Sequence, residues 1–411
     1  GGSTVYASLA GAVALTKTGA GTLTLSGANN TYSGGTSIGI DGAGTRIGVI
    51  RATTTGALGT GTINIGPGGN DETARLELTG GIVLANAITH NARNNASAGI
   101  ENISGNNTLS GAIGIDVGGS GIYIQSDAGT LTIGTASATA ISAMSGARVV
   151  TLQGAGNGNV VGAINPGGGS IALVKDGAGT WTLSSPNFYS GTTTVSSGTL
   201  LVNGSTSLGT VTVNGGALGG TGTIGGAVAV NSGGTLSPGA GGVGTLNING
   251  AITLAGGSTN AFEVNGTTLA KDSVVAGSSV TYGGVLNIVP SGSFTAGQQF
   301  QLFSGTGATN VSNFASIVGS PGSGKSFSFT NGVLSVVSAG PSGPGVITNS
   351  FSSGVLTLTW PAGQGWTLEG QTNNLSTGLN PAAWYPVSAS DGSFSTTVNP
   401  TNPAVFYRLK Y

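Results

Sequence analysis

One pattern occurs twice in this chain and limits its possible folds more than any other feature. Residues 15–38 and 173–195 share the frame L-x-K-x-G-A-G-T-x-T-L-S, followed by Asn and then by Tyr-Ser-Gly and a β-branched run. A degraded third copy covers Ile103–Ile113. Recurring glycine-punctuated β units predict a solenoid, because each unit buries its apolar face only by stacking on its neighbours.

The two copies match at one constant offset, and one residue is then dropped before the second Tyr-Ser-Gly. Because identity and spacing agree together, we take the shared positions as a repeat scaffold. They are Lys17, Gly19, Gly21, Leu25 and Tyr32 in the first copy, and Lys175, Gly177, Gly179, Leu183 and Tyr189 in the second.

Composition leaves two interpretations of the rest of the chain. Of 411 residues, 80 are glycine and only 6% are charged, and glycine-rich chains are often flexible linkers. Here, however, glycine alternates with short apolar runs such as Thr22–Leu25 and Leu200–Val202, as expected of strands. Helix is nearly excluded, since each interior glycine costs a helix about 1 kcal/mol relative to alanine.

Residues 1–338 share one pattern, in which short apolar runs alternate with glycine-rich turns. This pattern predicts a right-handed parallel β-solenoid with Val, Ile, Leu and Ala facing inward. At ~20 residues per coil, this region makes about 15–17 coils and a rod of about 70–80 Å. Phenylalanine becomes frequent after Ser237, which suggests a differently packed terminal section that seals the core. Strands are expected at Gly61–Ile65, Arg75–Leu78, Ile122–Gln125, Val149–Leu152, Val211–Val213, Ile248–Ile252 and Val285–Val289.

A Pro/Gly linker at 339–345 separates the solenoid from a module of another kind at 346–411. The module holds three of the four tryptophans, and we predict a small antiparallel β-sandwich. We favour its aromatic residues as core rather than as a sugar-binding platform. Its expected strands are Val355–Trp360, Trp366–Gln371, Trp384–Val387, Phe394–Val398 and Val405–Tyr411.

The frame at Lys17–Leu25 and Lys175–Leu183 resembles the autotransporter-associated β-strand repeat of bacterial passenger domains. The stretch from Gly234 through Phe303 also resembles the late passenger region of that family. The resemblance implies a right-handed parallel β-helix, export across a Gram-negative envelope, and display or release outside the cell. It also implies that the repeats are scaffold and carry no catalytic residues.

One departure from the family affects the export route. Autotransporters end in a membrane translocator barrel, and the module at 346–411 is too short for one, so we expect a chain that lacks the barrel and does not secrete itself. The module is similar to short C-terminal modules of other secreted β-repeat proteins. We therefore expect an extracellular or cell-surface protein whose signal peptide has already been removed.

Several classes of chemistry are disfavoured by the residue counts. The net charge is −1 and the Lys and Arg residues are scattered, which argues against a nucleic-acid partner. No apolar run approaches the ~20 residues of a membrane helix, so we expect no membrane insertion. With no cysteine and one histidine, we expect no catalytic residues, no metal and no cofactor.

Some polar residues still require an interpretation. We expect His90 at the surface or in a turn, and Lys17 and Lys175 as exposed edge charges that discourage lateral sheet pairing. The pairs Asn29-Asn30 and Asn106-Asn107 form either ladders or ordinary turns, and we favour turns.

The densest charged patch is interpreted as a solvated loop with local ion pairs. If its members converged in a groove, a polysaccharide-active β-helix enzyme would become a distant alternative. The patch consists of Asp71, Glu72, Arg75 and Glu77, followed by Arg93 and Glu101.

These observations predict an extracellular structural protein that self-assembles, head to tail, into a fibre or surface layer. Near-zero charge gives little repulsion between subunits, and a contact whose rotation does not close generates a filament. The alternative is a monomeric adhesin that binds a cell surface or glycan through its tail module. Possible assembly contacts are Val5, Tyr6, Trp360, Trp366, Trp384 and Tyr385.

Overall fold

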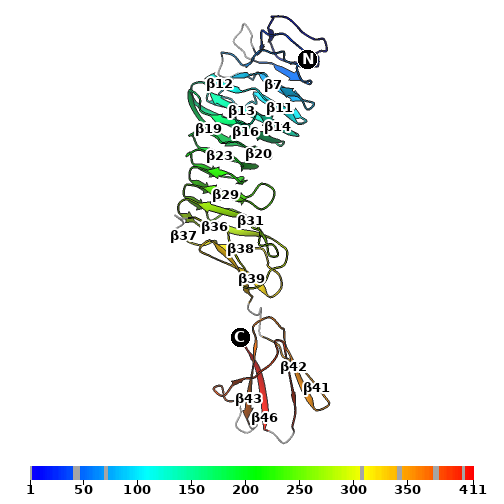
Figure 1. Ribbon diagram of the computed structural model, residues 1–411, viewed down its shortest axis with the longest axis vertical. Helices are drawn as coiled ribbons and strands as arrows, with labels where there is room; N and C mark the ends of the chain where they lie inside the picture. The colour runs from blue at the N-terminus through cyan, green and yellow to red at the C-terminus, as the bar shows by residue number, and fades with distance from the viewer. Residues whose placement is uncertain are drawn as a thin grey trace.

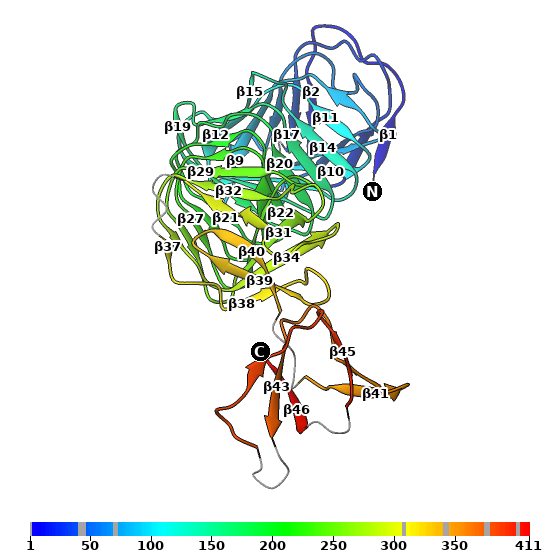
Figure 2. The same cartoon turned by 60° about the horizontal axis from the view of Figure 1, so that its bottom comes forward.

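The fold is a stack of β coils that forms a rod, with a small module beyond the last coil (Figure 1). The computed structural model describes residues 2–39, 47–68, 73–305, 310–339, 345–373, 379–399 and 403–411. Within these ranges every regular element is a strand. The turned view in Figure 2 shows the coils winding around a common axis. The prediction of a parallel β-solenoid is confirmed.

The longest face of the rod is a 14-stranded parallel sheet, called sheet A below. In spatial order its strands are β1 (Ser3–Val5), β3 (Thr22–Leu25), β5 (Val49–Ala52), β7 (Arg75–Thr79), β10 (Ile100–Ser104), β13 (Gly121–Ser126), β16 (Gly146–Gln153), β19 (Gly169–Lys175), β21 (Thr193–Val195), β24 (Val211–Val213), β27 (Val228–Val230), β30 (Ile252–Leu254), β33 (Val280–Thr281) and β37 (Asn310–Val311).

Three further parallel sheets complete the coils. Sheet C contains β8 (Val83–Leu84), β11 (Asn107–Leu109), β14 (Thr130–Ile133), β17 (Asn157–Val160), β20 (Thr180–Leu183), β22 (Thr199–Val202), β25 (Gly216–Gly220), β28 (Gly234–Pro238), β31 (Thr259–Asn265), β34 (Val285–Ser291) and β38 (Ser316–Val318). Sheet B contains β2 (Leu15–Lys17), β4 (Thr36–Ile38), β6 (Ile63–Ile65), β9 (Ile88–Ala92), β12 (Ile113–Gly118), β15 (Thr139–Ala143) and β18 (Ala163–Asn165). Sheet D contains β23 (Ser205–Thr206), β26 (Thr223–Ile224), β29 (Thr245–Ile248), β32 (Ser273–Ala276) and β36 (Phe303–Ser304).

The core of the rod consists of inward stacks of aliphatic side chains. Along sheet A, register partners on successive rungs place Ile50, Leu76, Ile100, Ile124 and Leu152 in one column, all 0% exposed. Burying each such side chain contributes about 1.5–3 kcal/mol, and no rung can bury its own side chains without the next. Stacking therefore stabilises the rod along its whole length.

The coils are longer and less regular than predicted. Neighbouring strands of sheet A are offset by as few as 17 residues, between Val211 and Val228, and by as many as 30, between Val280 and Asn310. The predicted 15–17 coils are therefore too many. The 14 rungs of sheet A span about 60 Å at a rung spacing of about 4.8 Å.

The C-terminal end of the solenoid is closed by a small antiparallel sheet of β35 (Gln299–Gln301), β40 (Val333–Ser338) and β39 (Lys325–Thr330). Aromatic rings of this sheet and of the last coils pack against one another, with centroids 5.0–6.3 Å apart. This confirms that the Phe-rich section seals the core. The rings belong to Phe262, Tyr282, Phe294, Phe300, Phe303, Phe314, Phe327 and Phe329.

The C-terminal module has two three-stranded antiparallel sheets. Sheet F consists of β41 (Thr348–Ser352), β42 (Val355–Thr359) and β45 (Ser393–Thr397), and sheet G of β44 (Tyr385–Pro386), β43 (Thr367–Asn373) and β46 (Ala404–Lys410). The five predicted strands are present, and β41 was missed. A hydrophobic cluster around Leu358, Trp360 and Leu368 is separate from that of the solenoid. Residues 340–344 of the predicted linker lie outside the described ranges.

Candidate functional site

Two repeat scaffold residues are buried lysines, which corrects a prediction. Lys175 is 0% exposed and Lys17 is 9% exposed, so neither is an exposed edge charge. Lys175 pairs in register with Leu152 and Val195, and therefore occupies the inward stack of sheet A. Lys17 pairs with Ile38 in the inward stack of sheet B.

The Lys175 ammonium is held by backbone carbonyls at the corner that follows its strand. Its Nζ donates to Asp176 O at 2.8 Å, to Gly177 O at 2.7 Å, and to Ser197 O of the next coil at 3.1 Å. Burial lowers the pKa of Lys175 from 10.5 to about 8, and the Asp176 carboxylate acts in the opposite direction, so the group is charged at neutral pH. A Cβ at Gly198 would lie 2.6 Å from Nζ, so the next coil requires glycine there.

The first copy repeats this arrangement. Lys17 Nζ donates to Thr18 O and Gly19 O, each at 2.7 Å, and burial lowers its pKa. A Cβ at Gly48 would lie 2.9 Å from Nζ, so a glycine of the next coil again leaves room for the ammonium. Two distant segments therefore share one corner geometry, in which the ammonium of an inward lysine donates to carbonyls of its own turn.

The predicted scaffold glycines allow this turn in two ways. Gly19, Gly21 and Gly177 have φ of 62°, 95° and 71°, the left-handed region that favours glycine. At Gly179 the reason is a close approach, because a Cβ there would lie 1.9 Å from Gly156 O of the preceding coil.

The scaffold tyrosines are also buried, and each bonds a threonine at the start of the next strand. Tyr32 Oη lies 2.7 Å from Thr36 Oγ1, and Tyr189 Oη lies 2.8 Å from Thr193 Oγ1. Burial raises the pKa of Tyr189 to about 12, so its hydroxyl stays protonated. The scaffold leucines Leu25 and Leu183 are both 0% exposed and face the core, as predicted.

A buried asparagine ahead of each tyrosine links three coils. Asn187 Oδ1 accepts from Ile164 N of the preceding coil, and its Nδ2 donates to Ser205 O of the next, each at 2.9 Å. Asn30 makes the same pair of bonds, each 2.6 Å long. Asn107 is buried too and accepts from the preceding coil at 2.8 Å. These side chains bridge coils through backbone groups, a role that neither predicted alternative describes.

The two copies lie on different faces of the rod. In the first, Lys17 ends a strand of sheet B and the following strand, β3, belongs to sheet A. In the second, Lys175 ends a strand of sheet A and β20 belongs to sheet C. The corner therefore works as a local unit, because its acceptors come from the turn itself and from the next coil.

Three residues of the predicted charged patch, Arg75, Glu77 and Glu101, form a ladder across successive rungs rather than a solvated loop. Glu77 is 2% exposed and receives Arg51 at 2.7 Å and Arg75 at 2.6 Å. Arg75 also binds Glu101 at 2.8 Å, and Gln125 donates to Glu101 at 3.3 Å on the next rung. The predicted ion pairs are present, but they lie on strands. Asp71 and Glu72 lie outside the described residues.

The ladder suits structural support more than catalysis. Burial, reinforced by a hydrogen bond with Asp127, raises the pKa of Glu101 to about 7, while Arg75 opposes the shift. A hydrolytic pair needs two carboxyl groups that reach a substrate. Both oxygens of Glu77 are bound by arginines, so this carboxylate serves as an acceptor that ties rungs together.

His90 is buried rather than exposed, which corrects a second prediction. It is 0% exposed on β9, with Nδ1 2.6 Å from Asn91 O and Nε2 3.2 Å from Arg93 Nη2. Burial, followed by the Arg93 charge, lowers the pKa of His90 from 6.5 to about 3. The ring is therefore neutral, donating from Nδ1 and accepting at Nε2. Arg93 also donates to Ala74 O at 2.9 Å, so it too serves the core.

The predicted contact residues of the module differ in exposure. Trp360 is 7% exposed and belongs to the core, whereas Tyr385 is 46% exposed. Trp366 packs against the core and meets the Tyr411 ring edge-on, with centroids 5.8 Å apart. The Trp384 ring is covered by the Arg408 guanidinium, 4.3 Å from its centroid. These four aromatic residues therefore do not form one continuous exposed surface.

The glutamate of sheet G is the charged centre of the module. Glu369 is 5% exposed and is bound by Arg408 at 2.7 Å and Lys410 at 3.2 Å. The hydrogen bond from Arg408 is the main cause that holds the pKa of Glu369 below its usual value.

At the other end, the predicted contacts lie on the first rung. Val5 is half-buried and pairs with Leu25, and Tyr6 is 78% exposed.

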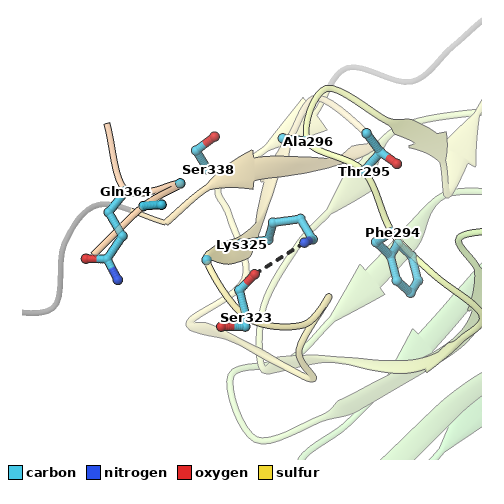
Figure 3. A pocket seen from close by; sticks show the side chains of 10 residues that line it. Phe294, Thr295, Ala296, Ser323, Lys325, Ser338 and Gln364 are labelled. Carbon is cyan, nitrogen blue, oxygen red and sulfur yellow. Dashed lines mark hydrogen bonds between the residues drawn. The ribbon is translucent and has the colours of Figure 1, made fainter. Parts of the chain in front are cut away.

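A cavity of about 490 Å³ lies between the cap of the solenoid and the module (Figure 3). Phe294 and Lys325 line it from the cap, and Gln364 from the module. Lys325 Nζ donates to Ser323 O at 3.2 Å and is the one ionisable residue of its described lining. The described lining of the cavity therefore presents one cation to its interior.

The described residues contain no group of three or more His, Cys, Asp or Glu side chains placed to hold a metal ion. A helix with the length and hydrophobicity needed to span a bilayer is also missing from the described part of the chain.

Comparison with known proteins identifies the repeat. The model of the family described as Passenger-associated-transport-repeat matches residues 15–45 and 173–202. The chain thus carries two such repeats in a β-solenoid, which confirms the resemblance noted in the sequence. It is a passenger-like β-helix, of a kind that is typically non-enzymatic and in general secreted or at the cell surface. No curated protein was found to match the chain.

Proposed function

We propose that the chain is an extracellular structural protein that self-associates through its C-terminal module into a fibre or surface layer. The solenoid acts as the rod and the module as the contact element. The repeats support the first part, because the side chains that the two copies share lie inside the rod: the lysines, asparagines and tyrosines all bond within and between coils.

The observation that carries the second part is the concentration of exposed apolar side chains on the module. Of 20 exposed large apolar side chains among the described residues, seven lie between 345 and 411, about a sixth of the chain. A high density of exposed apolar side chains on one small module supports a contact surface there. The seven are Val346, Phe351, Leu379, Tyr385, Val398, Val405 and Tyr411.

The solenoid cap directs assembly to the module rather than to the last coil. Head-to-tail stacking needs free strand edges at both ends of the rod. At the C-terminal end, β39, β40 and the aromatic cluster lie across the last rung. A near-zero net charge gives little repulsion at any contact.

A monomeric adhesin is the second candidate, favoured by the position of the module beyond the end of the rod (Figure 1). Sedimentation velocity over a wide concentration range, with negative-stain imaging of the same samples, separates the two. We expect masses that are multiples of the 39.3 kDa chain, and rods joined through their modules. A chain that stays monomeric at high concentration and binds glycans or cells would establish the adhesin instead.

A further inference from the structure

We propose that strand β41 is the self-association surface: two copies of the chain pair their β41 strands antiparallel and join sheet F of each into one continuous sheet. The inference rests on the proposed function and names one of its contacts: a two-fold contact closes at a dimer, so a fibre or layer also needs a second contact elsewhere on the chain. It follows from how the module protects, or leaves open, the edges of its two sheets.

Two of the four sheet edges in the module are protected, and a third is partly covered. In sheet G, β44 is two residues long and includes Pro386, and β46 carries Arg408 and Lys410. In sheet F, three of the five residues of β45 are half-buried, Phe394 among them, and Ser393 N donates to Ser390 O at 3.1 Å. Short strands, proline and charge are the usual devices that prevent edge-to-edge pairing.

The β41 edge has none of these devices. All five of its residues are exposed, and β42 is its one strand neighbour within the described residues. The sequence Thr-Asn-Ser-Phe-Ser has no charge and no proline, and neither β42 nor β45 adds a charged residue to the sheet. Figures 1 and 2 both place β41 at the outer side of the module.

An apolar feature accompanies the open edge. Phe351 is 61% exposed and lies opposite Leu356, which lines a cavity of about 340 Å³ between the sheets together with Val405 and Tyr407. The side of sheet F that carries Phe351 is therefore incompletely covered. A second strand beside β41 would place another phenylalanine on this same side.

These observations favour a second copy of the chain as the partner of the β41 edge. An antiparallel pair about a two-fold axis uses the same edge twice, so an unprotected edge is complementary to itself. If Ser350 lies on the axis, Asn349 of each copy faces Phe351 of the other. The two phenylalanines are then diagonal neighbours, within about 7–8 Å and reach of contact. Neutral strands meet without like-charge repulsion.

Charge exchange at these positions tests the register. In N349K/F351K every lysine faces a lysine of the partner, and in N349E/F351E every glutamate faces a glutamate. By sedimentation velocity we expect wild type to dimerise and each variant alone to associate about tenfold more weakly, since like charges directly opposite are destabilising. An equimolar mixture should recover the dimer, because each lysine then faces a glutamate.

A matched control places the same charges elsewhere on the sheet. Ser395→Lys with Thr397→Lys alters exposed positions of β45 and should leave association unchanged. Because the chain has no cysteine, Ser350→Cys gives an independent measurement. The Ser350→Cys variant should form an intermolecular disulfide on oxidation, whereas Thr397→Cys should not. The Ser350→Cys substitution also alters the strand less than the charge variants do.

The outcomes separate this inference from the proposed function. If wild type associates but the charge variants associate equally well, and Ser350→Cys does not cross-link, β41 is not the contact and the structural function stands. If wild type remains monomeric at every concentration, both proposals are overturned.

Discussion

Replacing Lys175 by methionine probes the repeat corner most sharply. Methionine keeps the length and most of the volume of the side chain but removes the ammonium. Three carbonyl groups, of Asp176, Gly177 and Ser197, then lose a donor that lay within 3.1 Å. Lys175 is 0% exposed, so water cannot simply replace the ammonium where it stood.

The magnitude follows from these contacts. A buried acceptor left without a partner costs about 1–3 kcal/mol, and burial of an ammonium costs several kcal/mol that methionine avoids. The carbonyls are only partly buried, which reduces the penalty further. We expect Lys175→Met to lower the free energy of unfolding by about 2–4 kcal/mol, a large share of the about 5–15 kcal/mol typical of a domain.

The first copy supplies the matched variant. Lys17 is 9% exposed and donates to two carbonyls, so Lys17→Met should lower the free energy of unfolding by about 1–2 kcal/mol. Guanidinium unfolding measures both, and hydrogen exchange of peptides covering 175–200 reports whether the loss is local. Stability of Lys175→Met at or above that of wild type would refute the reasoning, because the buried ammonium would then give no net stabilisation of the folded protein.

Three further predictions concern buried groups. Acidification should destabilise the protein through His90, whose pKa is 6.5 in the unfolded chain and about 3 in the folded protein. Between pH 6.5 and pH 3 only the unfolded chain binds the proton, so the free energy of unfolding should fall by about 1.4 kcal/mol per pH unit over this range. Comparing wild type with His90→Gln by urea unfolding at pH 7.0 and 4.5 should isolate a difference of about 2.7 kcal/mol, and parallel pH profiles would contradict the burial. Gly158→Ala should cost about 1–3 kcal/mol in thermal unfolding, because its Cβ would lie 2.2 Å from the Trp181 ring; an unchanged melting temperature would exclude the close packing. Tyr189→Phe should cost about 1–2 kcal/mol by removing the bond to Thr193, whereas wild-type stability would mean that the bond contributes nothing.

The fold could be predicted from the sequence because a single repeated pattern indicates the solenoid. The repeated lysine–glycine frame fixed the strand–corner–strand unit, and its leucines and tyrosines face the core as expected. Coil length was not accessible, since the 17- to 30-residue offsets depend on loops without a period. The face on which each repeat lies depends on the accumulated length of the coils between them, so the copies could not be placed.

The errors at Lys17, Lys175 and His90 share one cause. Each residue follows an inward Leu or Ile by two positions, and side chains at i and i+2 of a strand face the same side. The general rule that charged residues stay outside points the other way. Alternation was the better guide, but the carbonyls that make such burial possible come from turns and neighbouring coils, which no side-chain pattern reveals.

Cross-linking across rungs tests the in-register solenoid most directly. The chain has no cysteine, so Thr194→Cys with Thr212→Cys gives a single possible bridge between register partners on β21 and β24. At a rung spacing of about 4.8 Å their Cα atoms fall within the range of a disulfide, so mild oxidation should join them. The control, Thr194→Cys with Thr253→Cys, lies three rungs apart and should stay reduced. A bridge in the control pair, or none in the first, would contradict the account.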